Sequence, residues 1–225
     1  MNESDWCPIY ESILQAFGFD SDADEQARDV LAELTEPFDL DLLADLDGAT
    51  VAIAGAGPSL DAEVDVAREA DAVVAASTAA RVLGEHGVEI DAMVTDLDGA
   101  PETAVELSHS GTPVAVHAHG DNVAALREYV PQFDDAYLLP TTQAEPVEHV
   151  RNFGGFTDGD RAAFLADELG AARLTFPGWD FDDPAVDPMK AEKLHCAERL
   201  LYRLERDRGE RFDVLDGRRE EIEPA

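Results

Sequence analysis

Short apolar runs alternate with amphipathic segments over most of the chain, and this alternation constrains the fold more than any other feature of the sequence. The runs are rich in Val and Ala and lack the in-and-out alternation of half-buried strands. Continuous runs of this kind are typical of strands buried on both faces of a parallel sheet. We predict strands within residues 49–55, 71–77, 90–96, 112–118, 135–140 and 173–178.

The segments between these runs have the apolar spacing of helices that cross over a sheet. An α/β fold follows, with an open, mostly parallel, doubly wound sheet and flanking helices. Sheets of this class bind ligands beyond the carboxyl ends of their strands, near the point where the strand order reverses. The predicted crossover helices lie within residues 78–86, 104–109, 122–130 and 158–169.

Helical patterns also flank the predicted sheet at both ends. Apolar positions between residues 5 and 34 predict two or three helices, and those of residues 188–208 predict a closing helix. We therefore divide the chain into a small N-terminal helical segment packed on the main domain (1–47), an α/β catalytic domain (48–210) and a charged C-terminal tail (211–225).

The charge of the chain is far from balanced. Its 225 residues carry a formal net charge of -34, from 50 acidic and 16 basic residues, and Lys190 and Lys193 are the only lysines. The acidic residues are spread along the sequence, which indicates an acidic surface. In molar salt the Debye length falls to about 3 Å, so the repulsion among these charges is screened. We infer a halophilic cytoplasm, and we expect no nucleic-acid partner because an acidic surface releases few counterions.

The sequence also predicts a cytoplasmic protein without a membrane partner. No run approaches the roughly 18 uncharged apolar residues of a membrane span, and the N-terminus lacks the pattern of a secretion signal. Cys7 and Cys196 belong to no zinc or redox motif, so we expect free thiols. The sequence leaves open whether the chain forms a homo-oligomer.

The motif TDLDG places Asp96 and Asp98 directly after a predicted buried strand. Carboxylate oxygens of this kind suit Mg²⁺ that bridges phosphates. The Asp-x-Asp pattern alone says little, because this chain repeats it elsewhere. The position at a strand end favours a metal site over a solvated turn, since an ionised group beside a buried strand needs a partner.

The turn GAGPS follows the first predicted strand and contains Gly55, Gly57 and Ser59. It can present backbone N–H groups to a phosphate. It lacks the GK[ST] ending of a P-loop and the third glycine of a dinucleotide fingerprint, which disfavours an oxidoreductase. The alternative is a tight strand-to-helix turn with Ser59 as the helix cap.

The motif HAHGDN ends the fourth predicted strand. His117 and His119 can bind phosphate, transfer protons or ligate a metal, and Asp121 and Asn122 follow them. A buried histidine with a capping Asp121 is the alternative.

The motif NFGGFTDGDRA is a glycine-rich loop that runs into a predicted helix capped by Thr157 or Asp158. Gly154 and Gly155 allow a close approach of backbone to ligand, and Arg161 can clamp a phosphate. Glycine loops before helices are also common without a ligand.

A last strand end, GWDFDD, carries Trp179 and Phe181, which can stack on a flat heterocycle or belong to the local core. Lys190 and Lys193 lie three residues apart on the closing helix. We expect one of them, Lys193 in particular, to reach a triphosphate; a solvated pair is the alternative.

With these motifs in this order, the chain resembles the archaeal-type 6-hydroxymethyl-7,8-dihydropterin diphosphokinases between about residues 49 and 208. The resemblance implies ATP- and Mg²⁺-dependent transfer of diphosphate to the pterin hydroxymethyl group, with release of AMP, in the biosynthesis of folate-type or tetrahydromethanopterin cofactors. It also implies a sheet similar to that of thiamine pyrophosphokinases. Trp179 departs from the Met that the family pattern leads us to expect.

The motifs and the resemblance together imply site roles. Asp96 and Asp98 are the expected metal ligands, and these two and Asp121 are the expected catalytic residues, with Asp121 or a metal-bound carboxylate as the base. The expected ligand-binding residues are Gly55, Gly57, Ser59, His117, His119, Asn122, Gly154, Gly155, Thr157, Asp158, Arg161 and Lys193.

The sequence is also compatible with other functions. A thiamine pyrophosphokinase or a transferase that uses nucleotide sugars needs the same Asp-x-Asp and Mg²⁺ chemistry. A nucleotide-binding module without turnover is the alternative outside enzymes, although binding alone does not require so many carboxylates around a polyanion.

Overall fold

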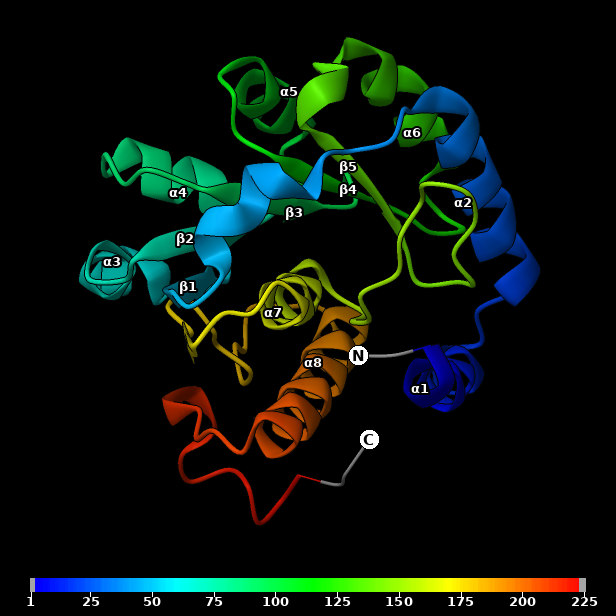
Figure 1. Cartoon of the computed structure of the whole chain (residues 1–225). Helices are drawn as coiled ribbons and strands as arrows, with labels where there is room; N and C mark the ends of the chain where they lie inside the picture. Colours follow the sequence, from blue (N-terminus) through cyan, green and yellow to red (C-terminus); the bar gives the residue numbers. More distant parts are fainter. Residues whose placement is uncertain (1–2, 223–225) are drawn as a thin grey trace.

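The computed structural model describes residues 3–222 and contains one parallel sheet with the strand order β5-β4-β3-β2-β1-β6 (Figure 1). Every pair of neighbouring strands is parallel. The strand order reverses after β5, since the chain returns to the far side of β1 to form β6. The strands are β1 (Thr50–Ala54), β2 (Ala72–Ala76), β3 (Ala92–Thr95), β4 (Val114–Ala118), β5 (Leu138–Thr142) and β6 (Arg173–Thr175).

Helices cover both faces of the sheet, which confirms the predicted doubly wound α/β fold. Four crossover helices lie on one face, and α7 and α8 lie on the other (Figure 1). Helix α7 contacts β1, β2 and β3 across the middle of the sheet. These helices are α3 (Leu60–Arg68), α4 (Ala79–Glu85), α5 (Pro101–His109), α6 (Val123–Tyr129), α7 (Asp158–Glu168) and α8 (Pro188–Arg208).

The central strands are continuous apolar runs because their side chains pack into two hydrophobic cores, one on each face of the sheet. In β1, Val51 and Ile53 pack against the side that carries α7 and α8, whereas Ala52 and Ala54 pack against the side that carries the crossover helices. All four side chains are fully buried. Successive side chains of a strand point to opposite faces, so a sheet covered on both faces requires apolar residues at every position.

The N-terminal segment supplies two helices, α1 (Glu3–Phe17) and α2 (Ser21–Leu34). Helix α1 joins the same hydrophobic core as α7 and α8, and α2 packs against β4, β5 and α6. The indole N–H of Trp6 donates to the backbone oxygen of Gln143 at 2.8 Å, so α1 is tied to the end of β5. The described residues also form four 3₁₀ helices: η1 (Leu40–Leu46), η2 (Val130–Gln132), η3 (Asp135–Tyr137) and η4 (Asp213–Leu215).

Helix α8 ends at Gly209, whose φ of 62° is left-handed. Residues 210–222 then fold back onto the domain, and Phe212 and Leu215 are fully buried in the core. The part of the predicted charged tail that the structure describes is therefore packed, and residues 223–225 lie outside the described range.

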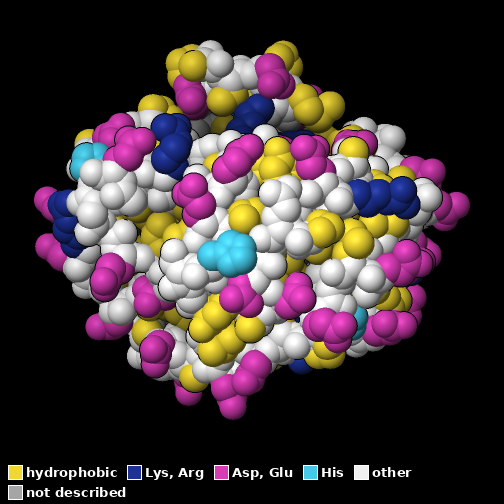
Figure 2. All heavy atoms as spheres, turned by 90° about the horizontal axis from the view of Figure 1, so that it is seen from above, with side chains coloured by type: hydrophobic (Ala, Val, Ile, Leu, Met, Phe, Trp, Pro, Cys, Tyr) yellow, Lys and Arg dark blue, Asp and Glu magenta, His cyan; other side chains and the backbone are white. Residues whose placement is uncertain are grey.

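Figure 2 shows one face of the molecule, over which acidic side chains are scattered more widely than basic ones. Cys7 is exposed and Cys196 is buried, and neither forms a disulfide within residues 3–222. Within residues 3–222, no helix has the length and apolar character that crossing a membrane requires.

Candidate active site

The turn after β3 brings Asp96 and Asp98 together. Leu97, between them, has a left-handed φ of 69° and is 3% exposed. The hydroxyl of Thr95 accepts a hydrogen bond from the Leu97 amide at 2.9 Å and so holds this sparsely populated conformation. A Cβ at Gly99 would lie 2.5 Å from the Ser77 hydroxyl, so a larger residue where the turn leaves the site would require the Ser77 side chain to shift. The tight turn leaves the two carboxylates as neighbours.

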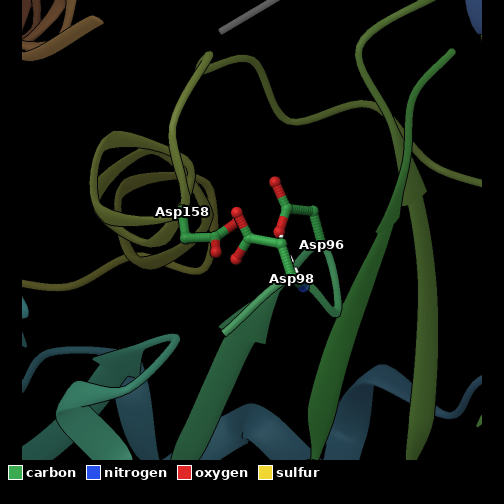
Figure 3. A group of neighbouring side chains, drawn as sticks. All are labelled: Asp96, Asp98 and Asp158. Carbon is green, nitrogen blue, oxygen red and sulfur yellow. Dashed lines mark hydrogen bonds between the residues drawn. The ribbon is translucent and has the colours of Figure 1, made fainter. Parts of the chain in front are cut away.

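Asp158 completes a group of three carboxylates (Figure 3). It stands at the first position of α7, on the opposite face of the sheet from the crossover helices. One ligand oxygen from each of Asp96, Asp98 and Asp158 lies within 4.8 Å of the other two. Hard oxygen donors at this spacing are the set that Mg²⁺ prefers in proteins. The residues therefore fit a divalent cation.

Side-chain nitrogens of His119 and Arg161 lie close to this group. His119 Nε2 is 3.3 Å from Asp96 Oδ2, and Arg161 Nη1 is 3.0 Å from Asp158 Oδ1 and 3.8 Å from Asp96 Oδ2. Burial alone would raise the pKa of Asp96, but the hydrogen bond to His119 and the charge of Arg161 bring it below its usual range. Asp96 is thus ionised at neutral pH.

The other two carboxylates shift the opposite way. Burial and the negative charge of Asp96 raise the pKa of Asp98, against the opposing charges of Lys190 and Lys193. Burial and the same negative charge raise the pKa of Asp158 well above its usual value, although Arg161 opposes the shift. Three carboxylates crowded in a partly buried site repel one another, and a bound cation would relieve that repulsion.

Two residues at the tip of β4 are buried, and two others line the pocket. His119 and Asp121 line the pocket described below. His117 is 2% exposed and lies behind the pocket, with Nδ1 3.1 Å from the Thr141 hydroxyl, and burial lowers its pKa well below the usual value. Asn122 is also buried and bonds only to backbone. Neither His117 nor Asn122 lines this pocket, and both lie behind it.

A second hydrogen bond, from the other terminal nitrogen of the guanidinium group to Gln143, also orients Arg161. Its Nη2 donates to the side-chain oxygen of Gln143 at 3.1 Å, and the Gln143 amide donates to Asp24 at 2.7 Å. Asp24 belongs to α2, so the N-terminal segment contributes to the position of this cation. The Nε atom of Arg161 and Nε2 of His117 have no hydrogen-bond partner among the described residues.

The glycine turn differs from the expectation. The amides of Gly55, Gly57 and Ser59 each donate at 2.9 Å to the loop at residues 177–180. These three donors are already satisfied within the protein. Ser59 occupies the N-cap position of α3, but its hydroxyl bonds to Glu63 at 3.3 Å and makes no capping bond. Gly55 and Gly57 still line the pocket through their backbone, whereas Ser59 does not.

The glycine-rich loop packs closely against Arg161. Gly155 has a φ of 94°, and a Cβ there would lie 2.6 Å from the Arg161 amide and Cα. Gly154 and Gly155 do not line the main pocket. Thr157 is the N-cap of α7 as predicted, and its amide and hydroxyl donate to the buried carboxylate of Asp160.

A pocket of about 430 Å³ joins these elements at the carboxyl ends of the strands. Lys190 and Lys193, the two lysines of the chain, both line it from α8, and Lys193 Nζ lies 5.9 Å from the centre of the Phe156 ring. Trp179 also lines it and donates through Nε1 to the Ile53 carbonyl at 2.8 Å, so its indole forms part of the wall.

Sequence reasoning missed several residues of this pocket. Asp158 was expected to contact the ligand but not to join the metal group. It is far from Asp96 in the sequence, so no local motif predicts that the start of α7 lies beside the tip of β3. Asp24 and Gln143 carry no motif. Phe19 and Asp20 also line the pocket, and the only signal for them was the aromatic and acidic composition of the loop after α1.

A family model described as 6-hydroxymethylpterin diphosphokinase MptE-like matches residues 26–185. The chain belongs to this family. Family membership confirms the resemblance inferred from the motifs, and it places the chain among diphosphokinase enzymes.

Three curated relatives of this MptE-like chain are each named 6-hydroxymethyl-7,8-dihydropterin pyrophosphokinase. The protein from Methanothermobacter thermautotrophicus is 39% identical over 221 residues, with 90% of this chain and 94% of the relative covered. The protein from Methanocaldococcus jannaschii is 32% identical over 228 residues, with 89% and 95% covered. The protein from Pyrococcus furiosus is 40% identical over 186 residues, with 80% and 79% covered.

Proposed function

We propose that the protein transfers the terminal diphosphate of ATP to the hydroxymethyl group of 6-hydroxymethyl-7,8-dihydropterin, with Mg²⁺ as cofactor and AMP as the second product. One observation carries the proposal: three carboxylates converge in a pocket that also holds Arg161 and both lysines, in a member of the diphosphokinase family. A polyanion needs this combination, because acids hold its metal and cations hold its free oxygens.

Asp96, Asp98 and Asp158 would hold the metal. When bound, Mg²⁺ supplies positive charge to the triphosphate oxygens and offsets the repulsion between the nucleotide and the carboxylates. Arg161 holds Asp158 at 3.0 Å, so the ligand at the start of α7 is fixed in position before any substrate arrives.

The cationic side chains of the pocket bind and orient the phosphates. Arg161 is fixed by Asp158 and Gln143, whereas Lys190 and Lys193 lie on α8 across the pocket. In the reaction, the acceptor oxygen forms a bond to the β-phosphorus as the bond from that phosphorus to the oxygen bridging the α-phosphate breaks. Positioning and charge stabilisation supply most of the rate enhancement in such transfers.

The hydroxyl proton of the acceptor must leave during the transfer. Asp121 is an exposed carboxylate at the tip of β4, beside His119, and it lines the pocket. Its carboxylate accepts no hydrogen bond from the described residues, so its oxygens are available to a substrate hydroxyl. We assign base assistance to Asp121, with a modest effect because a loose transition state needs little help from a base.

A panel of acceptors tests the proposal. The protein is incubated with ATP and Mg²⁺ in molar KCl, with 6-hydroxymethyl-7,8-dihydropterin, thiamine or no acceptor, and AMP is measured. A parallel reaction replaces ATP with a UDP-sugar. AMP formation that depends on the pterin supports the proposal. Activity with thiamine alone, turnover of the UDP-sugar alone, or ATP binding without AMP release under any condition would refute it.

A further inference from the structure

The pocket extends to both sides of the carboxylate group at the tip of β3. In the strand order, β2, β1 and β6 lie to one side of β3, and β4 and β5 lie to the other. We call the first side the β1–β6 arm; it is lined by residues 55–57 and 178–180. We call the second side the N-terminal arm; it is lined by Phe19, Asp20, Asp24, Gly120, Asp121 and Gln143.

The β1–β6 arm suits the nucleotide. It lies where the strand order reverses, which is where open α/β sheets bind nucleotides. Its floor is backbone: a Cβ at Gly57 would lie 2.4 Å from Asp180 Oδ2 and 2.7 Å from the Gly178 oxygen. Asp180 and Asp183 add carboxylates of the kind that accept hydrogen bonds from ribose hydroxyls.

The N-terminal arm has a different chemistry. The half-buried ring of Phe19 stacks on Phe17 at 5.6 Å and lies 6.4 Å from Phe156, so an aromatic surface borders the arm. Asp20 is exposed at the N-cap of α2, where Oδ1 accepts from the Asp22 amide at 3.1 Å. Oδ2 of Asp20 has no donor among the described residues. An aromatic face next to an available carboxylate suits a flat heterocycle that carries N–H donors.

Hydrogen bonds within the protein fix the shape of the N-terminal arm. The buried carboxylate of Asp24 accepts three hydrogen bonds of 2.7 Å, from the Tyr10 hydroxyl, the Gly120 amide and the Gln143 side chain. These bonds join α1, α2 and the tips of β4 and β5. Asp24 is therefore a structural centre of the arm, whereas Asp20 faces the ligand space.

We propose, on the basis of the diphosphokinase function above, that the acceptor heterocycle binds in the N-terminal arm, stacked on Phe19 and hydrogen-bonded to Asp20. The pyrimidinone edge of a pterin presents a ring N–H beside an amino group, which is a donor pair that a carboxylate matches. Phe19 and Asp20 precede residue 26, where the family-model match begins. Acceptor specificity is thus set by a segment outside the matched region.

Equilibrium binding tests this assignment independently of turnover. The fluorescence of 6-hydroxymethylpterin reports acceptor binding, and α,β-methylene-ATP reports nucleotide binding. Asp20→Asn keeps the capping ability of the residue but removes the charge, and it is expected to weaken pterin binding about tenfold. Phe19→Ala is expected to weaken it about fivefold. Neither variant should change the affinity for the nucleotide analogue, whereas Asp180→Asn should weaken the analogue alone.

Asp22→Asn is the matched control, because Asp22 is exposed in the same helical turn and does not line the pocket. Thermal unfolding of each variant checks the fold. Unchanged pterin affinity in both Asp20→Asn and Phe19→Ala, or a loss of nucleotide affinity instead, would overturn the assignment. A wild-type protein that binds the nucleotide analogue but no pterin would instead count against the proposed function itself.

Discussion

The side-chain amide of Asn122 donates a hydrogen bond to the backbone oxygen of Asp96 at 2.8 Å. The same nitrogen donates to the His117 oxygen at 2.7 Å, and the amide oxygen accepts from the His119 amide at 3.0 Å. One buried side chain therefore holds the tip of β3 against the tip of β4. The position of Asp96 depends on a neighbour that makes no contact with the pocket.

Replacing Asn122 by Asp keeps the shape but turns two donors into acceptors that face two backbone oxygens. We expect Asn122→Asp to lower the free energy of unfolding by about 2–4 kcal/mol, because buried polar groups lose their partners. Chemical denaturation of Asn122→Asp and of Asp121→Asn, an exposed neighbour, measures the effect. A loss of stability in Asp121→Asn alone would contradict the role of the Asn122 amide.

The strands and helices could be predicted because the sheet is buried on both faces. Runs such as that around Val51 and Ile53 are apolar at every position, and the segments between them have helical spacing. The strand order could not be predicted in the same way. Periodicity reports which residues are buried, but it does not report which strand lies beside β1.

The site was predictable only where motif and strand end coincide, as at Asp96. Gly155 was expected to contact a ligand because glycine lets the backbone approach closely. In the structure, the backbone that approaches Gly155 closely is that of Arg161. His117 was expected to contact a ligand because it belongs to the polar motif that ends β4. Its side chain is 2% exposed and bonds to the Thr141 hydroxyl of the neighbouring strand, and the motif does not report this burial. Asp24 had no local signal, since its partners come from distant parts of the chain.

Gly155 is expected to tolerate no side chain. Its φ of 94° strains any other residue, and a Cβ would meet the backbone of Arg161 at 2.6 Å. We expect Gly155→Ala to cost about 2–4 kcal/mol of stability. Gly87→Ala is the control, because Gly87 has a φ of 68° with nothing within 4 Å of its Cβ position, and it should cost about 1 kcal/mol. Equal losses in urea denaturation would show that the contact with Arg161 is unimportant.

Glu205 links stability to pH. Burial would raise its pKa, but the hydrogen bonds from Arg219 and from the Phe212 amide outweigh burial and lower it. A lowered folded-state pKa gives stability that is present above the unfolded pKa of about 4.3 and is lost as the pH falls through the folded value.

We therefore expect the unfolding free energy of the wild type to fall more steeply below about pH 4.3 than that of Glu205→Gln. At pH 7 the variant should be less stable by about 1–3 kcal/mol, because Arg219 loses a buried partner. Thermal unfolding between pH 3 and pH 7 measures both effects. Glu220→Gln, at an exposed position, is the control, and the same acid dependence in Glu205→Gln and the wild type would rule out the linkage.

The net charge of -34 predicts a strong dependence of stability on salt. Acidic side chains are spread over the surface seen in Figure 2, and their repulsion acts over a Debye length of about 10 Å at 0.1 M salt but about 3 Å at 1 M. We expect the unfolding temperature to rise markedly from 0.1 M to 2 M KCl. Equal unfolding temperatures across this range would contradict adaptation to a halophilic cytoplasm.

Product analysis with labelled ATP tests the central claim most directly. In molar KCl with Mg²⁺ and 6-hydroxymethyl-7,8-dihydropterin, α-labelled ATP should give labelled AMP, and γ-labelled ATP should give a labelled pterin diphosphate in equal amount. Asp96→Asn should lower kcat by about a thousandfold, whereas Asp41→Asn, in an Asp-x-Asp pair outside the pocket, should not change it. Formation of ADP and a pterin monophosphate, or wild-type turnover in Asp96→Asn, would contradict diphosphate transfer at this carboxylate group.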